Sequence, residues 1–117
     1  MNQKKNNLFS LENQIVFLTG AAGQLGTEIA NGLLLMGARV VAVDKNISDL
    51  ETASKKNSWD SDYVICLECD VTNKNNIEDC FQTAINKYGV INSLVANAGV
   101  SVFEPYMERE ESSIDHV

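Results

Sequence analysis

Four places in this sequence carry residue types that could bind a ligand made of phosphate and sugar, and each follows the end of a short apolar run. Glycines leave backbone N–H groups open to phosphate oxygens, and carboxylates or amides can hydrogen-bond hydroxyl and amino groups. If the apolar runs are parallel strands, their carboxyl ends lie on one edge of a sheet, where such sheets bind ligands. The sequence therefore predicts one crevice built from Thr19 with Gly20, Asp44, Asp70, and Asn97 with Gly99.

The first place reads T-G-A-A-G-Q-L-G from Thr19 to Gly26, between an expected strand and an expected helix. Its first glycine permits a sharp turn, its second lets backbone approach a pyrophosphate, and its third lets helix and strand pack closely. The N–H groups at the helix start would then face the phosphates, where the helix dipole favours negative charge. We expect phosphate binding here rather than a plain structural turn. The candidate residues are Gly20, Gly23, Gln24, Leu25 and Gly26.

Asp44 is the candidate for binding the ribose of an adenine nucleotide. It follows Gly20 at about the 20-residue separation expected for an acid that hydrogen-bonds a ribose. The same carboxylate would repel a 2′-phosphate, so NAD is favoured over NADP as the cofactor. The adjacent Lys45 could partly neutralise that repulsion, and Asp44 could instead be a surface residue that ends a strand.

Two further places could contact the two ends of a dinucleotide. Asp70 could accept a hydrogen bond from an adenine amino group, while Val71 offers backbone and an apolar edge; alternatively, Asp70 helps to start the next helix. Small residues after the fourth run would let the cofactor ribose approach, and Asn97 could also bond neighbouring backbone. These last candidates are Asn97, Ala98 and Gly99.

The three cysteines do not indicate a metal or redox site. Cys66 and Cys69 have C-x-x-C spacing, but there is no second cysteine pair and the single histidine is His116. A zinc or thioredoxin-like site needs a second ligand pair or a helix start, and the pair falls inside an apolar run. We expect free thiols that pack at a strand and its end, and no bound metal.

Apolar runs and helical spacing alternate along the chain. Continuous apolar runs bounded by glycine or aspartate predict buried strands, and apolar residues three or four apart predict helices. Leu25, Ile29, Leu33 and Met36 are expected to share one helix face, and Gly37 to end that helix. The expected strands are Ile15 to Leu18, Arg39 to Val43, Tyr63 to Leu67 and Ile91 to Ala96. The expected helices are Gln24 to Met36, one capped by Asn46, and one capped by Thr72 and closed by Gly89.

This alternation predicts the α/β fold class: a Rossmann-like, doubly wound parallel sheet of strand order 3-2-1-4. The 117 residues suit one domain, with residues 1–10 flexible and a further helix beginning in the charged stretch Glu104 to Glu111. Because the chain stops after the fourth strand, we expect the domain to be incomplete and that strand to form an exposed apolar edge.

Composition excludes several kinds of partner. The formal net charge is −7, so nucleic acid and anionic membrane surfaces should be repelled. The apolar runs are too short to cross a bilayer, and no secretory signal follows the N-terminal lysines, so a cytoplasmic location is expected. A dinucleotide is anionic too, and local dipoles must outcompete the overall charge to hold it.

Together, T-G-A-A-G-Q-L-G, Asp44, the C-D-V-T of Cys69 to Thr72 and the A-N-A-G of Ala96 to Gly99 resemble the short-chain dehydrogenase/reductase family. The resemblance implies an NAD(P)-dependent oxidoreductase that interconverts alcohols and carbonyl compounds and is a homo-oligomer when complete. It assigns the pyrophosphate to the glycine turn, the ribose to Asp44, the adenine to Asp70 with Val71, and the nicotinamide side to the last motif. This chain departs from the commonest family pattern at Gln24, where glycine is usual, and at Ala96, where asparagine is frequent.

The resemblance also places catalysis beyond these motifs, on a serine and a Tyr-x-x-x-Lys pair. Tyr63, Tyr88 and Tyr106 are not followed by lysine at the fourth place. We therefore expect no catalytic residues in this chain and no hydride transfer by the chain alone. Two alternatives remain: a nucleotide-binding module without chemistry, and a relative of sugar-nucleotide epimerases or dehydratases, whose glycine spacing is similar.

Overall fold

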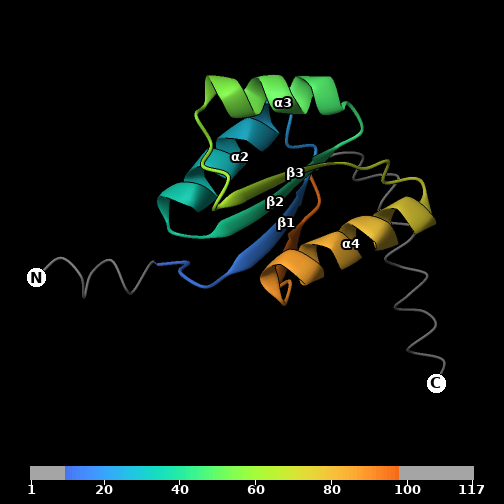
Figure 1. The fold of residues 1–117 in the computed structure, drawn as a ribbon. Coiled ribbons are helices and arrows are strands. Elements are labelled where there is room, and N and C mark those ends of the chain that lie inside the picture. The colour runs from blue at the N-terminus through green and yellow to red at the C-terminus, as the bar shows by residue number, and fades with distance from the viewer. Residues whose placement is uncertain (1–9, 98–117) are drawn as a thin grey trace, which may run out of the picture.

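The structure, a computed structural model, describes residues 10–97 (Figure 1). The expectations for residues 1–9, for Ala98 and Gly99, and for the helix in Glu104 to Glu111 lie outside this part. Strands and helices alternate along the described chain. In order they are β1 (Ile15–Thr19), α2 (Gln24–Leu35), β2 (Arg39–Asp44), α3 (Ile47–Lys56), β3 (Val64–Glu68), α4 (Lys74–Tyr88) and β4 (Ser93–Val95).

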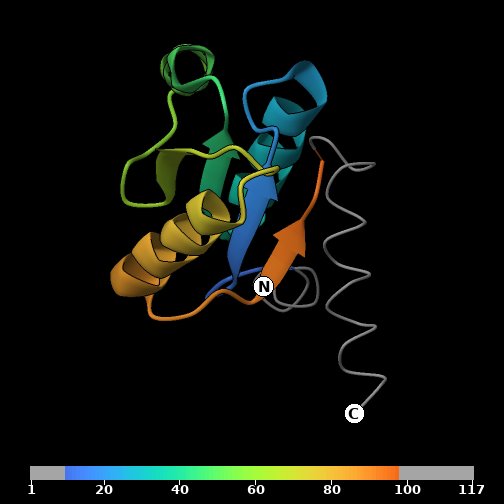
Figure 2. The same cartoon turned by 90° about the vertical axis from the view of Figure 1, so that its right-hand side faces the viewer.

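The four strands form one parallel sheet of order β3-β2-β1-β4, which confirms the predicted topology. β1 is central: Val16 lies between Val40 of β2 and Ser93 of β4. Figures 1 and 2 show α2 and α3 over one face of the sheet and α4 over the other. The order of the strands reverses at β1, with β2 and β3 on one side of it and β4 on the other. In such sheets, ligands bind at the carboxyl ends of the strands where this reversal occurs.

Apolar strands are buried on both faces because helices cover both. Leu18, Val40 and Ala42 pack towards α2 and α3, where they meet Ala30 and Leu50. The alternate positions of the same strands pack towards α4, and there the rings of Phe17 and Phe81 meet edge to face at 4.5 Å. One core cluster thus lies on each face of the sheet, between strands and helices, as continuous apolar runs predict.

The apolar face expected for the first helix is only partly right. Ile29 and Leu33 are half-buried against the sheet, but Leu25 is 62% exposed and Met36, just past the helix, is 41% exposed. The fully buried positions of α2 are the small residues Gly26 and Ala30. The helix lies so close to the strands that small residues, and not the largest apolar ones, face the sheet.

The cap expected for the third helix is wrong. Asn73 caps α4, since its side chain accepts from the Asn76 N–H at 3.0 Å. Thr72 is held elsewhere, because its hydroxyl donates to Asp70 Oδ1 at 2.6 Å. The C-terminal end agrees with expectation: Gly89 closes the helix in the left-handed conformation, with φ of 90°.

The fourth strand is shorter than the run of apolar residues that predicted it. β4 pairs with β1 at only three positions, from Ser93 to Val95. Before it, Asn92 serves the start of β1: its side-chain oxygen accepts from the Ile15 N–H at 2.7 Å, and its own N–H donates to Ile15 O at 2.8 Å. Of the helices within residues 10–97, none has the length and apolar character needed to cross a membrane.

Candidate functional site

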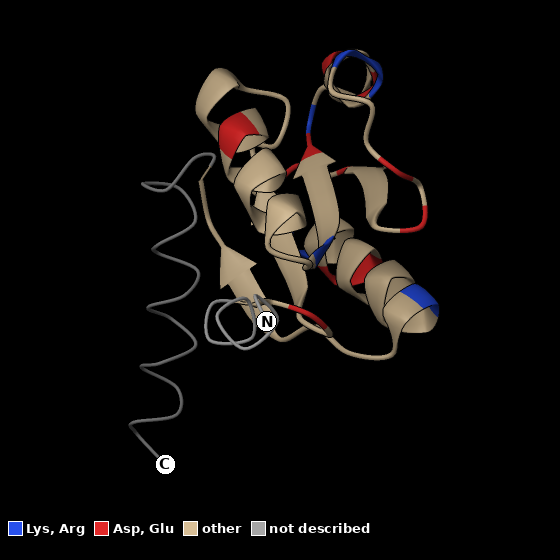
Figure 3. Ribbon diagram, turned by 90° about the vertical axis from the view of Figure 1, so that its left-hand side faces the viewer, with Lys and Arg blue, Asp and Glu red and all other residues tan. Residues whose placement is uncertain are grey.

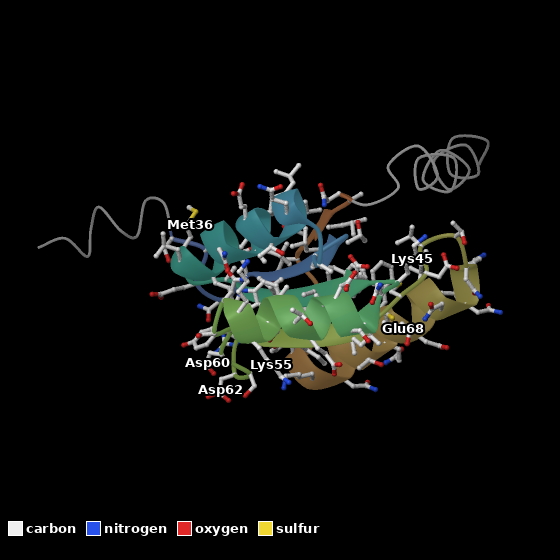
Figure 4. All side chains as sticks on the ribbon, turned by 90° about the horizontal axis from the view of Figure 1, so that it is seen from above. Met36, Lys45, Lys55, Asp60, Asp62 and Glu68 are labelled. Carbon is white, nitrogen blue, oxygen red and sulfur yellow. The ribbon has the colours of Figure 1, made fainter. Side chains whose placement is uncertain are left out.

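A cavity of about 440 Å³ lies at the carboxyl ends of the strands. Seven of the predicted cofactor-binding residues line it: Gly20, Gly23, Asp44, Lys45, Asp70, Val71 and Asn97. Figure 4 shows Lys45 at this end of the sheet and Met36 and Asp60 at the opposite end. Residues from the ends of all four strands therefore meet at one rim, as the sequence predicts.

The glycine turn leads directly from β1 into α2. Gly20 has φ of 67°, a conformation that favours glycine, and the turn closes with a hydrogen bond of 3.3 Å from Gly23 N to Gly20 O. A Cβ on Gly26 would lie 1.9 Å from Gly20 O, so the third glycine permits the close packing of helix and strand. A Cβ on Gly23 would make only an ordinary contact, at 3.6 Å from the same oxygen.

The N-terminus of α2 has no anion of its own. Gly23 is the cap residue and makes no side-chain cap hydrogen bond, and the first turn contains no acidic residue. Unpaired N–H groups at a helix start, together with the helix dipole, attract negative charge. This end of the helix can therefore accept a phosphate group from a ligand.

Three predicted residues of the turn lie outside the cavity wall. Gly26 is buried under the turn, and the side chain of Leu25 is largely exposed. Gln24 is exposed and lines a separate groove between α2 and α3. Any contact these three make with a ligand in the cavity would come from the backbone at the helix start.

Asp44 joins the end of β2 to the glycine turn. One carboxylate oxygen accepts from the Ala22 N–H at 3.1 Å, and the other accepts from the Asn46 N–H at 3.0 Å. The backbone at the end of β2 also bonds the segments on either side of it. Val43 O accepts from Ala21 N of the glycine turn at 3.1 Å, and Asp44 O accepts from Cys69 N, just after β3, at 3.0 Å. A carboxylate offers about four acceptor positions, so Asp44 keeps room for ligand hydroxyls.

Asp70 and Thr72 form a compact turn at the end of β3. Asp70 Oδ1 accepts from both the backbone N–H and the hydroxyl of Thr72, at 2.9 and 2.6 Å. These bonds, helped by the charge of Lys45, lower the pKa of the exposed Asp70 carboxyl. Within residues 10–97 the second oxygen, Oδ2, has no hydrogen-bond partner, so it can accept from a ligand.

Asn97 connects the ends of β4 and β1. Its backbone N–H donates to Thr19 Oγ1 at 2.9 Å, and its side-chain amide donates to Gly20 O at 3.3 Å. The structural role that the sequence suggested for Asn97 is therefore present, and its position on the cavity wall leaves the ligand role open as well.

The C-x-x-C cysteines do not form a ligand pair. Cys66 packs with the core beneath α2 and α3, whereas Cys69 is buried in the core beneath α4, beside Cys80. Burial and the neighbouring Cys80 raise the pKa of the Cys69 thiol to about 12. Among the described residues there is no cluster of metal-ligating side chains, and all three cysteines are free.

Sequence reasoning missed three residues of the cavity wall, Val43, Cys69 and Thr72. Val43 and Cys69 are apolar neighbours of the two predicted acids, and no polarity signal marks them. Thr72 was predicted to cap a helix, but a threonine two positions after an aspartate is also typical of a turn closed by the aspartate side chain.

Charge is distributed without a basic stripe. Figure 3 shows lysines and arginines scattered over the described elements among acidic residues. An anionic ligand at this rim would be held by the helix start and by hydrogen bonds, with Lys45 as the cation on the cavity wall.

Comparison with known proteins gives one family. The family model described as short chain dehydrogenase matches residues 14–117. An uncharacterized oxidoreductase of Mycobacterium bovis is 32% identical over 100 residues, which are 86% of this chain and 40% of that protein. The 15-hydroxyprostaglandin dehydrogenase [NAD(+)] of Bos taurus is 34% identical over 93 residues, which cover 75% of this chain and 34% of that protein.

Solved structures agree with this result. A hydroxysteroid dehydrogenase from Escherichia coli superimposes with a TM-score of 0.72 and 29% identity, covering 81% of this chain and 40% of that one. A 3-ketoacyl-(acyl-carrier-protein) reductase from Brucella melitensis, complexed with NADH, gives 0.66 and 25%, covering 73% and 34%. The chain thus spans well under half the length of the proteins it matches.

Proposed function

Because this chain belongs to the short-chain dehydrogenase family, we propose that it holds the dinucleotide of an NAD-dependent oxidoreductase that interconverts alcohols and carbonyl compounds. The convergence of an uncapped helix start, a glycine turn and two carboxylates on one cavity carries this proposal. At about 440 Å³ the cavity lies in the range of about 300 to 1,000 Å³ typical of small-molecule sites. Bound NAD would supply the hydride acceptor of such a reaction.

The residues present fit a dinucleotide. The pyrophosphate would lie against the start of α2, where the backbone of Gln24 and Leu25 offers N–H groups and the buried Gly26 keeps the turn close to the strand. Asp70 and Val71 would contact the adenine. The nicotinamide side is proposed for the segment Asn97, Ala98 and Gly99, of which only Asn97 is described.

Asp44 would bind the adenosine ribose and select NAD over NADP. Its two observed hydrogen bonds, to Ala22 and Asn46, fix the carboxylate at the cavity wall and leave acceptor positions for the ribose hydroxyls. A 2′-phosphate at the same place would bring like charges together, and Lys45, also on the wall, would offset only part of this repulsion.

Calorimetric titration of the chain with NAD and with NADP tests this function. We expect the wild type to bind NAD more tightly by about tenfold, in line with a hydrogen bond to a charged group. Asp44→Ala should weaken NAD binding and remove most of the preference. Asp44→Asn is the matched control: it keeps an acceptor oxygen but loses the charge, so it should bind NADP better than the wild type does.

Two outcomes would contradict the proposal. The first is no detectable heat with NAD at millimolar concentration from folded protein. The second is NAD binding that neither Asp44 variant changes, since the ligand would then lie elsewhere.

We further propose that these 117 residues alone transfer no hydride, because none of their tyrosines is followed by lysine at the fourth place. In the proposed chemistry, a tyrosine hydroxyl held beside a lysine exchanges the proton at the substrate oxygen. Incubation of the purified chain with NADH and a panel of ketones should therefore give no loss of NADH absorbance above the protein-free rate. Turnover that scales with protein concentration would refute this.

A further inference from the structure

Asn76 lies in the first turn of α4, outside the cavity wall, and its side chain holds the backbone of the turn formed by Asp70 and Thr72. Its side-chain oxygen accepts from the N–H of Asp70, in the loop between β3 and α4, at 2.7 Å. On the other side of the same residue, the Asp70 carboxylate accepts from Thr72 and faces the cavity wall. The orientation of Asp70 is thus set from both its backbone and its side chain.

The Asn76 side chain is itself held by the buried face of α4. Its amide nitrogen lies 3.8 Å from Cys80 Sγ and donates to it. Cys80 is only 5% exposed, and its thiol donates to Glu68 O, at the end of β3, at 3.4 Å. A continuous set of contacts therefore runs from the helix core through Asn76 to Asp70 at the rim.

Helix capping does not account for the Asn76 side chain. The cap is Asn73, whose side chain already accepts from the Asn76 backbone N–H at 3.0 Å. The Asn76 side-chain oxygen is left to serve Asp70 alone among the described residues. Its removal would leave the Asp70 N–H without this partner and free the turn to change its angle to the cavity.

We propose that Asn76 is a positioning residue, which aims the Asp70 carboxylate at the exocyclic amino group of adenine and thereby sets the preference for adenine over other purines. This inference rests on the proposed function, because it requires a dinucleotide in the cavity. It gives Asn76 no direct contact with the ligand.

The test compares NAD with nicotinamide hypoxanthine dinucleotide, in which a carbonyl oxygen replaces the adenine amino group. A carboxylate accepts from the amino group but not from the oxygen, so the wild type should prefer NAD by about tenfold. Asn76→Ala should bring this ratio close to one, mainly by weakening NAD. Asn76→Asp keeps an acceptor oxygen in the same place and should restore most of the preference.

Asn75→Ala is the matched control, since Asn75 is the neighbouring asparagine of the same helix turn and is exposed. It should leave both affinities unchanged. If Asn76→Ala loses helix content by circular dichroism, Asn76→Gln carries the same expectation, because its longer side chain moves the oxygen away from the Asp70 N–H.

The outcomes separate this inference from the function beneath it. If the wild type binds both dinucleotides and the substitutions at Asn76 leave the ratio unchanged, or lower both affinities equally, the positioning role is overturned and the NAD site stands. A wild type that binds both dinucleotides equally also overturns it. If the wild type binds neither, the proposed function falls together with the inference.

Discussion

At the scale of single residues, the cavity depends on side chains that hold backbone as well as face a ligand. Asp44 fixes the glycine turn through Ala22 while keeping acceptor positions for a ribose. Asp70 has one oxygen tied to Thr72, and the other is without a partner within residues 10–97. A carboxylate that is already fixed loses little conformational freedom when a ligand arrives, which favours binding.

Thr72 should control the ionisation of Asp70. Its hydroxyl and N–H lower the pKa of that carboxyl, so Thr72→Val, which keeps the N–H and loses the hydroxyl, should raise this pKa towards its ordinary value. A carbon-13 NMR titration of the aspartate carboxyls would measure the midpoint. Thr83→Val is the control, because the Thr83 hydroxyl bonds Asp79 O on the exposed side of α4. An unchanged Asp70 midpoint in Thr72→Val would contradict this assignment.

Residue types after each strand were sufficient to predict seven residues of the cavity wall, including Asp44 and Asp70. The reason is geometric. Parallel strands have their carboxyl ends on the same edge of the sheet, so a residue that directly follows a strand is expected at that edge. Contacts between side chains were not predictable in this way. That Thr72 would bond Asp70, and that Asn73 would cap the helix instead, depends on a competition between nearby donors that sequence spacing does not resolve.

At the scale of elements, the distance between α2 and the sheet determines the glycine motif. Gly26 faces Gly20 O so closely that a Cβ there would lie 1.9 Å from that oxygen. Apolar periodicity predicted a wider face that includes Leu25 and Met36, both of which are exposed. Periodicity reports where apolar side chains lie around a helix, but not how near the helix comes to its neighbour.

Two glycines of the same helix provide a matched test of this packing. Gly26→Ala should destabilise the fold by about 2 kcal/mol or more, because the clash is with backbone that cannot move without opening the turn. Gly32→Ala should stabilise it by about 0.5 to 1 kcal/mol, since no atom beyond the adjacent helix backbone lies within 4 Å of a Cβ there and alanine favours helix. Urea unfolding followed by circular dichroism measures both. Equal effects of the two substitutions would show that the close approach is not required.

At the scale of the whole molecule, the sheet has an edge strand that could pair with another chain. Among the strands within residues 10–97, β4 pairs only with β1, and its Leu94 and Val95 are half-buried. An apolar edge with open backbone groups is a template for pairing between chains.

The topology of the sheet was predictable because each crossover helix was visible in the sequence. The length of β4 was not predictable from the sequence, because it depends on the hydrogen bonds by which Asn92 joins the start of β1.

We expect the chain to self-associate through this edge. Sedimentation velocity across a range of concentrations should show a rising apparent mass. Ser93→Lys, which places a charge on the exposed start of β4, should reduce it, because edge lysines oppose pairing. Ser61→Lys adds the same charge at an exposed position outside the strands and should not. A monodisperse monomer at high concentration would count against edge pairing.

The location of bound NAD on the molecule tests the proposed cofactor site directly. Besides the groove between α2 and α3, residues 10–97 form two cavities of similar size at opposite ends of the sheet: the one at the carboxyl ends, and one of about 450 Å³ lined by Trp59 and Tyr63 near the start of β3. Titration of nitrogen-15-labelled chain with NAD, followed by amide NMR, distinguishes them. We predict shifts concentrated at Gly20, Gly23, Asp44 and Asp70, with the Trp59 indole signal unmoved. Shifts centred on Trp59, or none at saturating NAD, would show that NAD does not bind at the carboxyl ends of the strands.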